Sequence, residues 1–189
     1  MYELKSFTED ELANALANDY TTPVEVKKKY HFDYFFGYLK DLEAKTIVIE
    51  PEYISKDYLH DYTSYYSLCY KEYPKVCSRV HFFSLDFNKR DFEILINNGS
   101  PSVDIRNSYL GFIVVRPIPN TVIGFTVLKP YVHSTGFNQR NFWGLKKYPV
   151  HLFGIKLEVE SLAFQEQDSV VSACATAAIW SMLQGGDSA

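Results

Sequence analysis

The spacing of apolar residues in the first half of the chain predicts four amphipathic helices, over residues 8–18, 33–44, 55–70 and 88–97. Apolar side chains recur there at intervals of three and four residues, which places them on one face of a helix. The first helix opens with a capping box formed by Thr8 and Glu11, and Ser55 and Asp86 can cap the third and fourth helices. A short buried strand at residues 46–50 and a weakly alternating strand at residues 79–85 separate these helices.

The second half of the chain changes to the pattern of antiparallel strands. Mostly apolar runs separated by turns predict two hairpins, formed by residues 109–115 with 121–128 and by residues 149–153 with 155–162. In the last of these runs Ile155, Leu157 and Val159 alternate with polar residues, which is the pattern of a strand with one buried face. Helices with short strands, followed by antiparallel hairpins, predict an α+β fold.

The last part of the chain, residues 163–189, predicts a different element. Residues 165–169 are polar, and an Ala-rich run that is apolar almost all the way round continues to Leu183. A helix without a polar face is a buried helix, so we expect the fold to end in a buried helix that follows the α+β region of residues 1–162. Cys174 falls in the first or second turn, where unpaired amides and the helix dipole lower the pKa of a thiol.

The order of Gln167, a polar spacer, Cys174 and a nearby Trp180 resembles the nucleophile segment of papain-like cysteine peptidases. The resemblance implies a thiol protease or a related acyl-transfer hydrolase, with Cys174 as nucleophile and Gln167 as oxyanion donor. Its substrate would be a polypeptide or another acyl compound. Residues 109–117 and 124–130 are also similar to the stretch that precedes a papain-like segment in uncharacterised bacterial proteins.

This chain departs from the papain-like pattern at two points. Gln167 precedes Cys174 by more residues than the family usually has, and no histidine follows Cys174. By the resemblance, residues 163–189 are therefore the first helix of a truncated papain-like domain, and we expect the chain to be inactive as a peptidase because its base is missing. His133 and His151 are weaker alternatives for the base, since a triad is defined by geometry and not by sequence order.

The competing interpretation is a non-catalytic protein-binding or assembly module in which Cys174 is a packed core residue. Free cysteine is among the most buried residue types, and within an Ala-rich helix it permits close packing. His31, His60 and His81 are interpreted as packed or surface residues. An apolar helix over residues 170–183 needs a partner, so a homo-oligomer formed through this helix is a possible assembly.

Composition restricts the remaining partners and cofactors. The formal charge of −4 gives no general attraction to phosphate, so no nucleic-acid partner is expected. No apolar run approaches the roughly 20 residues that span a bilayer, so no membrane insertion is expected. Cys69, Cys77 and Cys174 form no CxxC pair, which favours a reducing compartment and a cytoplasmic location. No phosphate-binding glycine pattern or zinc-ligand spacing is present, so neither cofactor nor metal is expected.

Overall fold

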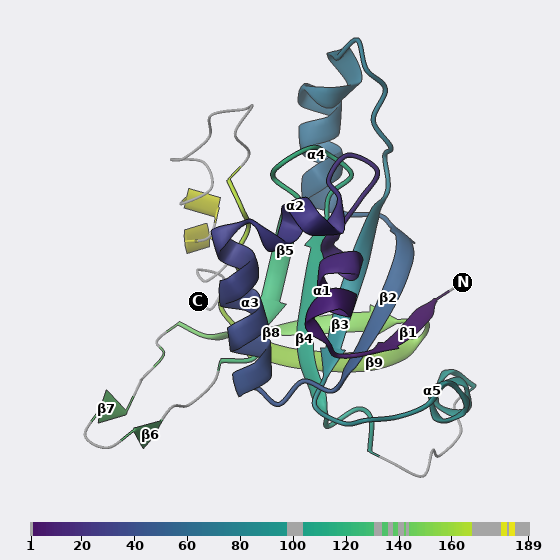
Figure 1. The fold of residues 1–189 in the computed structure, drawn as a ribbon, viewed down its shortest axis with the longest axis vertical. Coiled ribbons are helices and arrows are strands. Elements are labelled where there is room, and N and C mark those ends of the chain that lie inside the picture. The colour runs from purple at the N-terminus through teal and green to yellow at the C-terminus, as the bar shows by residue number, and fades with distance from the viewer. Residues whose placement is uncertain are drawn as a thin grey trace.

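The computed structural model describes residues 2–97, 104–130, 134–135, 138–139, 142, 144–167, 179–180 and 182–183. Within these residues, a five-stranded antiparallel sheet forms the centre of the fold (Figure 1). Its strands lie side by side in sequence order: β1 (Glu3–Ser6), β2 (Thr46–Tyr53), β3 (Cys77–Phe83), β4 (Tyr109–Val115) and β5 (Ile123–Leu128). The chain has the α+β fold that its sequence predicts, with helices inserted between the strands.

One face of the sheet is covered by helices from the first quarter of the chain, α1 (Glu9–Leu16), α2 (Pro23–Lys27) and α3 (Tyr30–Asp41) (Figure 1). Leu12 of α1 and Phe32 of α3 pack in one apolar core with Ile47, Val80 and Ile113 of the strands. These strand residues share a face because side chains alternate along a strand. Removing such apolar surface from water is the main stabilising contribution to folding.

The opposite face is covered by a hairpin that runs across the central strands, formed by β8 (Lys146–Leu152) and β9 (Ile155–Ser161) (Figure 1). The remaining elements are α4 (Lys56–Ser64), the short 3₁₀ helix η1 (Tyr66–Leu68), α5 (Lys89–Ile96), β6 (Ser134–Thr135) and β7 (Asn138–Gln139). Val150 and Leu157 of the hairpin share a second apolar core with Phe83, Phe112 and Val127 of the sheet. The fold therefore has three layers, with the central sheet in the middle.

Several elements confirm the sequence prediction. β4 pairs with β5 and β8 pairs with β9, which are the two predicted hairpins. Thr8 accepts a hydrogen bond from the Glu11 amide at the start of α1, and Ser55 accepts one from the Tyr58 amide at the start of α4. α5 begins slightly later than predicted, because Asn88 and not Asp86 is its cap and accepts from the Asp91 amide.

Four short elements were missed, α2, β1, β6 and β7, and the first two illustrate why. Pro23 begins α2 at its first turn, where no amide proton is required, and Thr22 and Glu25 form a reciprocal capping box. β1 has four residues of mixed exposure, too few for an alternating pattern, and it forms by pairing with β2. The capping box of α2 is a local signal, but its five residues are too few to show a helical period, whereas β1 depends on its pairing with β2.

Several predicted boundaries were wrong, and two of them have identifiable reasons. β2 continues past Pro51 to Tyr53, because the pairing with β3 shifts register between Glu50 and Tyr53 and Glu52 adopts a positive φ of 57°. A proline within such an irregularity interrupts no ladder hydrogen bond. The predicted helix over residues 55–70 stops at Ser64, because Tyr65 leaves the helical region at φ −135° and ψ −59°.

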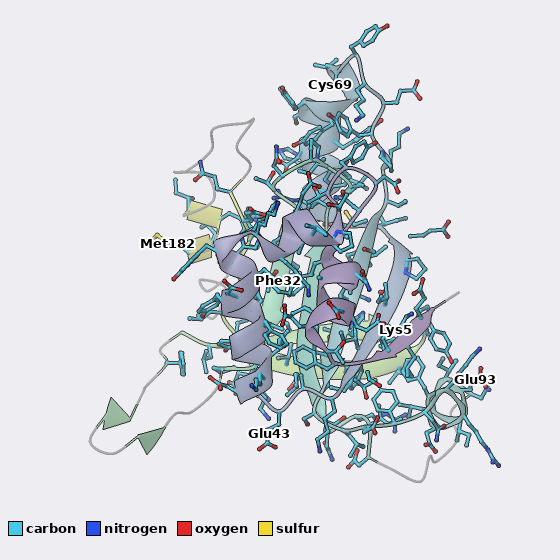
Figure 2. All side chains as sticks on the ribbon, in the orientation of Figure 1. Lys5, Phe32, Glu43, Cys69, Glu93 and Met182 are labelled. Carbon is cyan, nitrogen blue, oxygen red and sulfur yellow. The ribbon has the colours of Figure 1, made fainter. Side chains whose placement is uncertain are left out.

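The described residues after β9 return to the edge of the central sheet. Phe164 and Thr126 of β5 exchange backbone hydrogen bonds of 2.9 and 2.7 Å. Farther on, Ile179, Trp180, Met182 and Leu183 are helical, as predicted. Ile179, Met182 and Leu183 are exposed, in contrast to the buried helix that their pattern predicts, and Figure 2 shows Met182 at the periphery of the molecule.

Candidate functional site

A groove of about 490 Å³ lies between α3 and the strands β5 and β9. Its lining is mostly aromatic and aliphatic and includes Tyr34 and Phe35 of α3, Leu128 of β5 and Phe164. The rings of Phe35 and Phe164 lie 6.1 Å apart in an edge-to-face arrangement. Among its polar groups, Thr126 donates its hydroxyl to a backbone oxygen. The groove therefore suits an apolar group of ligand size.

His31 lines the same groove from the first turn of α3. Its Nδ1 lies 3.6 Å from Oε1 of Glu166, and Oε2 of Glu166 accepts the Ile123 amide at 3.1 Å. Lys29 is the N-cap residue of α3, and no side chain caps this helix end. An uncapped helix N-terminus leaves amide donors available and carries a partial positive charge.

Arg116 connects the backbone of Glu166 to the sheet. The residue follows β4 and is only 4% exposed. One terminal nitrogen of its guanidinium donates to the backbone oxygens of Thr121 at 2.6 Å and Glu166 at 3.1 Å. Its aliphatic part passes over Gly124, where a Cβ would lie 3.0 Å from Arg116 Cγ. Arg116 therefore fastens the segment that leads to Gln167 against the turn between β4 and β5.

We call Lys29, His31, Arg116 and Glu166 the α3 cluster. Within the described part of the chain, its buried Lys29 Nζ, His31 Nε2 and Arg116 Nε have no hydrogen-bond partner, and neither has the nearby Thr121 hydroxyl. Burial lowers the pKa of Lys29, although the Glu166 charge opposes this effect, and burial likewise lowers the pKa of His31. The cluster thus brings more buried donors together than it has acceptors.

A second polar cluster lies between the central sheet and the β8–β9 hairpin, and we call Glu50, Arg79, His81 and Tyr109 the sheet cluster. Arg79 forms an ion pair of 2.7 Å with Glu50 and donates to the His151 backbone oxygen at 2.6 Å. His81 is fully buried, with Nδ1 2.9 Å from the Tyr109 hydroxyl and Nε2 3.5 Å from Glu50 Oε2. The cluster joins β2, β3 and β4 to β8.

The electrostatics of the sheet cluster favour one protonation state. Burial lowers the pKa of His81 to about 4, so this imidazole is neutral near pH 7. Burial raises the pKa of Glu50, but His81 and Arg79 outweigh it and hold that pKa below its usual value. Burial also keeps the Tyr109 hydroxyl protonated by raising its pKa. The Tyr53 ring covers the guanidinium of Arg79 at 4.1 Å from its centroid.

The predicted site residues are only partly within the described chain. Gln167 is exposed and directly follows Glu166, which is held against β5. His151 is exposed on β8, and its backbone oxygen is bound by Arg79 of β3. These two residues thus lie next to different strands of the sheet. Cys174 and His133 lie outside the described residues.

Sequence reasoning did not identify the α3 cluster. His31 was interpreted as packed or surface, and Lys29 belongs to a run of lysines that is typical of a solvated face. Arg116 stands in a strand-Arg-Pro pattern that carries no chemistry by itself. Glu166 lies 50 residues from Arg116 along the chain, so no local pattern connects these two residues. Tertiary contact alone brings them together.

Among the described residues, no group of three His, Cys, Asp or Glu side chains is arranged to hold a metal ion. In the same part of the chain, no helix has both the length and the apolar character to cross a membrane. No family model, curated protein or solved structure matches this chain. Because no relative indicates a function, the chemistry of the two clusters and of the groove is the basis for the proposals below.

Proposed function

We propose that residues 165–183 are the nucleophile segment of a papain-like cysteine peptidase or related thiol acyl-transfer enzyme. In this proposal Cys174 attacks the carbonyl of a polypeptide or acyl substrate, and Gln167 donates a hydrogen bond to the oxyanion that forms. An oxyanion donor is effective only if it is held in place before the reaction. The proposal therefore depends on how the backbone around Gln167 is fixed.

The observation that carries the proposal is the anchoring of the approach to Gln167. Phe164 pairs with β5, and the Glu166 amide donates to the Ile123 oxygen at 3.0 Å. The Glu166 backbone oxygen accepts from buried Arg116. The residue before Gln167 is thus held from both sides of its backbone, while the Gln167 side chain is exposed. This combination supports a preorganised donor that a substrate can reach.

A second anchor follows Cys174 in the sequence, at Trp180. The Trp180 indole nitrogen donates to Asp57 Oδ1 at 3.3 Å, and the indole packs edge-on against Phe125 of β5 at 5.4 Å. Phe125 and Thr126 are neighbours on β5, so the described residues before and after Cys174 are attached to the same strand. This arrangement supports one functional segment over residues 165–183.

The proposal requires a base for the thiol proton. In this sequence His133 and His151 are the candidates that follow from the papain-like interpretation, and His151 is exposed on β8. His133→Ala and His151→Ala should each be measured for thiol reactivity. An unchanged reactivity in both variants would remove these histidines as bases and leave the base to another polypeptide segment.

The test is the alkylation rate of each thiol in the native protein between pH 5 and 9, measured by peptide mass spectrometry. Cys174 should react fastest, with a midpoint well below the roughly 8.5 of a free thiol. Buried Cys77 is the internal control, because burial raises its pKa to about 12, and half-buried Cys69, near the tip of the α4 region, is the second (Figure 2). If Cys174 reacts only on unfolding, the thiol-enzyme proposal is wrong.

A protein-binding module is the second candidate function, and the aromatic groove beside α3 favours it. Cys174 would then be a packing residue, so the same alkylation experiment separates the two functions. Exposed Ile179, Met182 and Leu183 support self-association through residues 170–183. A monomeric mass by light scattering at high protein concentration would contradict that assembly. The free thiols of Cys69 and Cys77 support a cytoplasmic location.

A further inference from the structure

The N-terminus of α3 concentrates positive charge without a matching acceptor. α3 has 12 residues, so its end carries a full helix dipole, and its N-cap Lys29 supplies no capping side chain. Lys29 itself adds an ammonium group whose Nζ is buried and has no hydrogen-bond partner in the described chain. Asp33, the acidic residue of this first turn, is exposed. The helix end is therefore a candidate site for an anion.

The carboxylates near this helix end already have other partners. Glu166 Oε2 accepts the Ile123 amide, and Oε1 lies beside His31 Nδ1. Glu25, which also acts on Lys29, accepts from the Thr22 amide at 2.8 Å within the capping box of α2. Neither carboxylate forms an ion pair with Lys29. Burying an unpaired charge is unfavourable, so a bound anion would stabilise this helix end.

Buried Arg116 provides an independent observation. Its Nε has no partner among the described residues, although the residue is only 4% exposed. The same guanidinium contacts the Glu166 backbone, and the Glu166 carboxylate contacts His31 on α3. The unpartnered nitrogens of His31 and Arg116 thus belong to one connected cluster around Glu166, and the charges of Glu166 and Arg116 also act on Lys29.

The charge of the cluster indicates which anion fits. Lys29 and Arg116 carry one positive charge each, Glu166 carries one negative charge, and a neutral His31 carries none. A singly charged acid therefore balances the cluster, whereas a phosphate dianion exceeds it. His31 also lines the apolar groove of about 490 Å³, so the anion site and the groove meet at one side chain.

We propose that the α3 cluster and the adjacent groove bind a carboxylate that is attached to an apolar or aromatic group. The carboxylate would accept a hydrogen bond from Lys29 beside the His31 ring, and the apolar group would occupy the groove beside Tyr34 and Phe35. A polypeptide ending in an apolar residue and a free acylated amino acid share this chemistry. The inference does not depend on Cys174 and goes beyond the proposed thiol chemistry.

The experiment is a calorimetric titration of the full chain with N-acetyl-L-phenylalanine and with its amide, at constant ionic strength and pH 7. The acid should bind at least about tenfold more tightly than the amide, which corresponds to one charge-assisted contact of about 1.4 kcal/mol. Lys29→Met should remove this preference, while Lys28→Met, a change at the exposed neighbouring lysine, should retain it. Lys29→Gln, which keeps a polar side chain, provides a second variant with the same expected loss should Lys29→Met not fold.

Three outcomes would overturn the inference. Equal binding of acid and amide would show that no cation recognises the carboxylate. Equal loss in Lys28→Met and Lys29→Met would show a general charge effect. Acetate or inorganic phosphate binding as tightly as N-acetyl-L-phenylalanine would show that the groove takes no part. A peptide ending in free phenylalanine, compared with the acylated amino acid, distinguishes the two sources of the ligand, because only a chain-end site prefers the peptide.

Discussion

The sheet cluster and the α3 cluster contain similar residue types, but they differ in whether their buried polar atoms have hydrogen-bond partners. Each has an arginine, a histidine and a glutamate whose contacts join distant parts of the chain. Among the described residues, every buried side-chain nitrogen and oxygen of the sheet cluster has a hydrogen-bond partner. In the α3 cluster, Lys29, His31 and Arg116 each have a nitrogen without one. The same residue types therefore do not imply the same role.

The difference follows from where each cluster lies. The sheet cluster is enclosed between β2, β3, β4 and the β8–β9 hairpin, and each group fixes a neighbouring element. A fully satisfied buried network rigidifies the fold around it. The α3 cluster lies at the β5 edge beside an open groove, where a further group can enter. A cluster whose buried polar atoms all have hydrogen-bond partners thus indicates a structural role, and a cluster with unpartnered atoms beside a groove indicates a binding role.

The largest expected effect comes from breaking the sheet cluster. Arg79→Met keeps the side-chain volume but leaves the Glu50 charge without its ion pair, which has a distance of 2.7 Å. Removing one partner of a buried pair costs about 3–5 kcal/mol. The free energy of unfolding in urea should fall by this amount. A loss below about 1 kcal/mol, the range of a surface ion pair, would show that the pair is not structural.

The second expected effect is a loss of folding stability as the pH falls. The pKa of His81 is about 4 in the folded protein and near 6.5 when exposed, so the unfolded chain binds more protons between these values. Stability should therefore be complete above about pH 6.5 and fall by about 3 kcal/mol as the pH decreases to 4. The lowered pKa of Glu50 acts in the same direction below about pH 4.5.

Urea unfolding at several pH values measures this dependence. His81→Gln should flatten the slope between pH 4 and 6.5, and His60→Gln, at an exposed histidine, should leave it unchanged. An equal slope in wild type and His81→Gln would place the acid sensitivity in other groups.

The smallest stability effect is expected in the α3 cluster. Lys29→Met removes an ammonium group that has no partner in the described chain, so no ion pair is broken. Stability without ligand should stay equal or rise by up to about 1 kcal/mol, because an unpaired buried charge is removed. A loss above about 2 kcal/mol in urea unfolding would show that Lys29 has a structural partner, and the comparison between the clusters would fail.

The elements with strong local patterns could be predicted from the sequence, and the clusters could not. The alternation of Ile155, Leu157 and Val159 identified β9, and Ser55 identified the start of α4. The predicted segment of Gln167 and Cys174 rested on a local order of residue types. Neither cluster has such an order, because ion pairs depend on which strands become neighbours.

Glu50 and Arg79 illustrate this limit. They meet because β2 and β3 pair in one register, which places them opposite each other. A shift of β2 by one residue would move Glu50 to the other face of the sheet, away from Arg79. His81 had the pattern of a packed residue and is one, whereas His31 had a similar setting and lines a groove. Local sequence does not separate these two histidines.

The most direct test of the difference between the clusters is the pKa of the Lys29 ammonium, measured by NMR of its ¹³Cε signal with Lys29→Met for assignment. In the free protein this pKa should lie below the usual 10.5, because burial disfavours the charge. Saturation with N-acetyl-L-phenylalanine should raise it, because a carboxylate partner stabilises the ammonium. A pKa at or above the usual value that the acid leaves unchanged would show that Lys29 is already paired, and would contradict the carboxylate site.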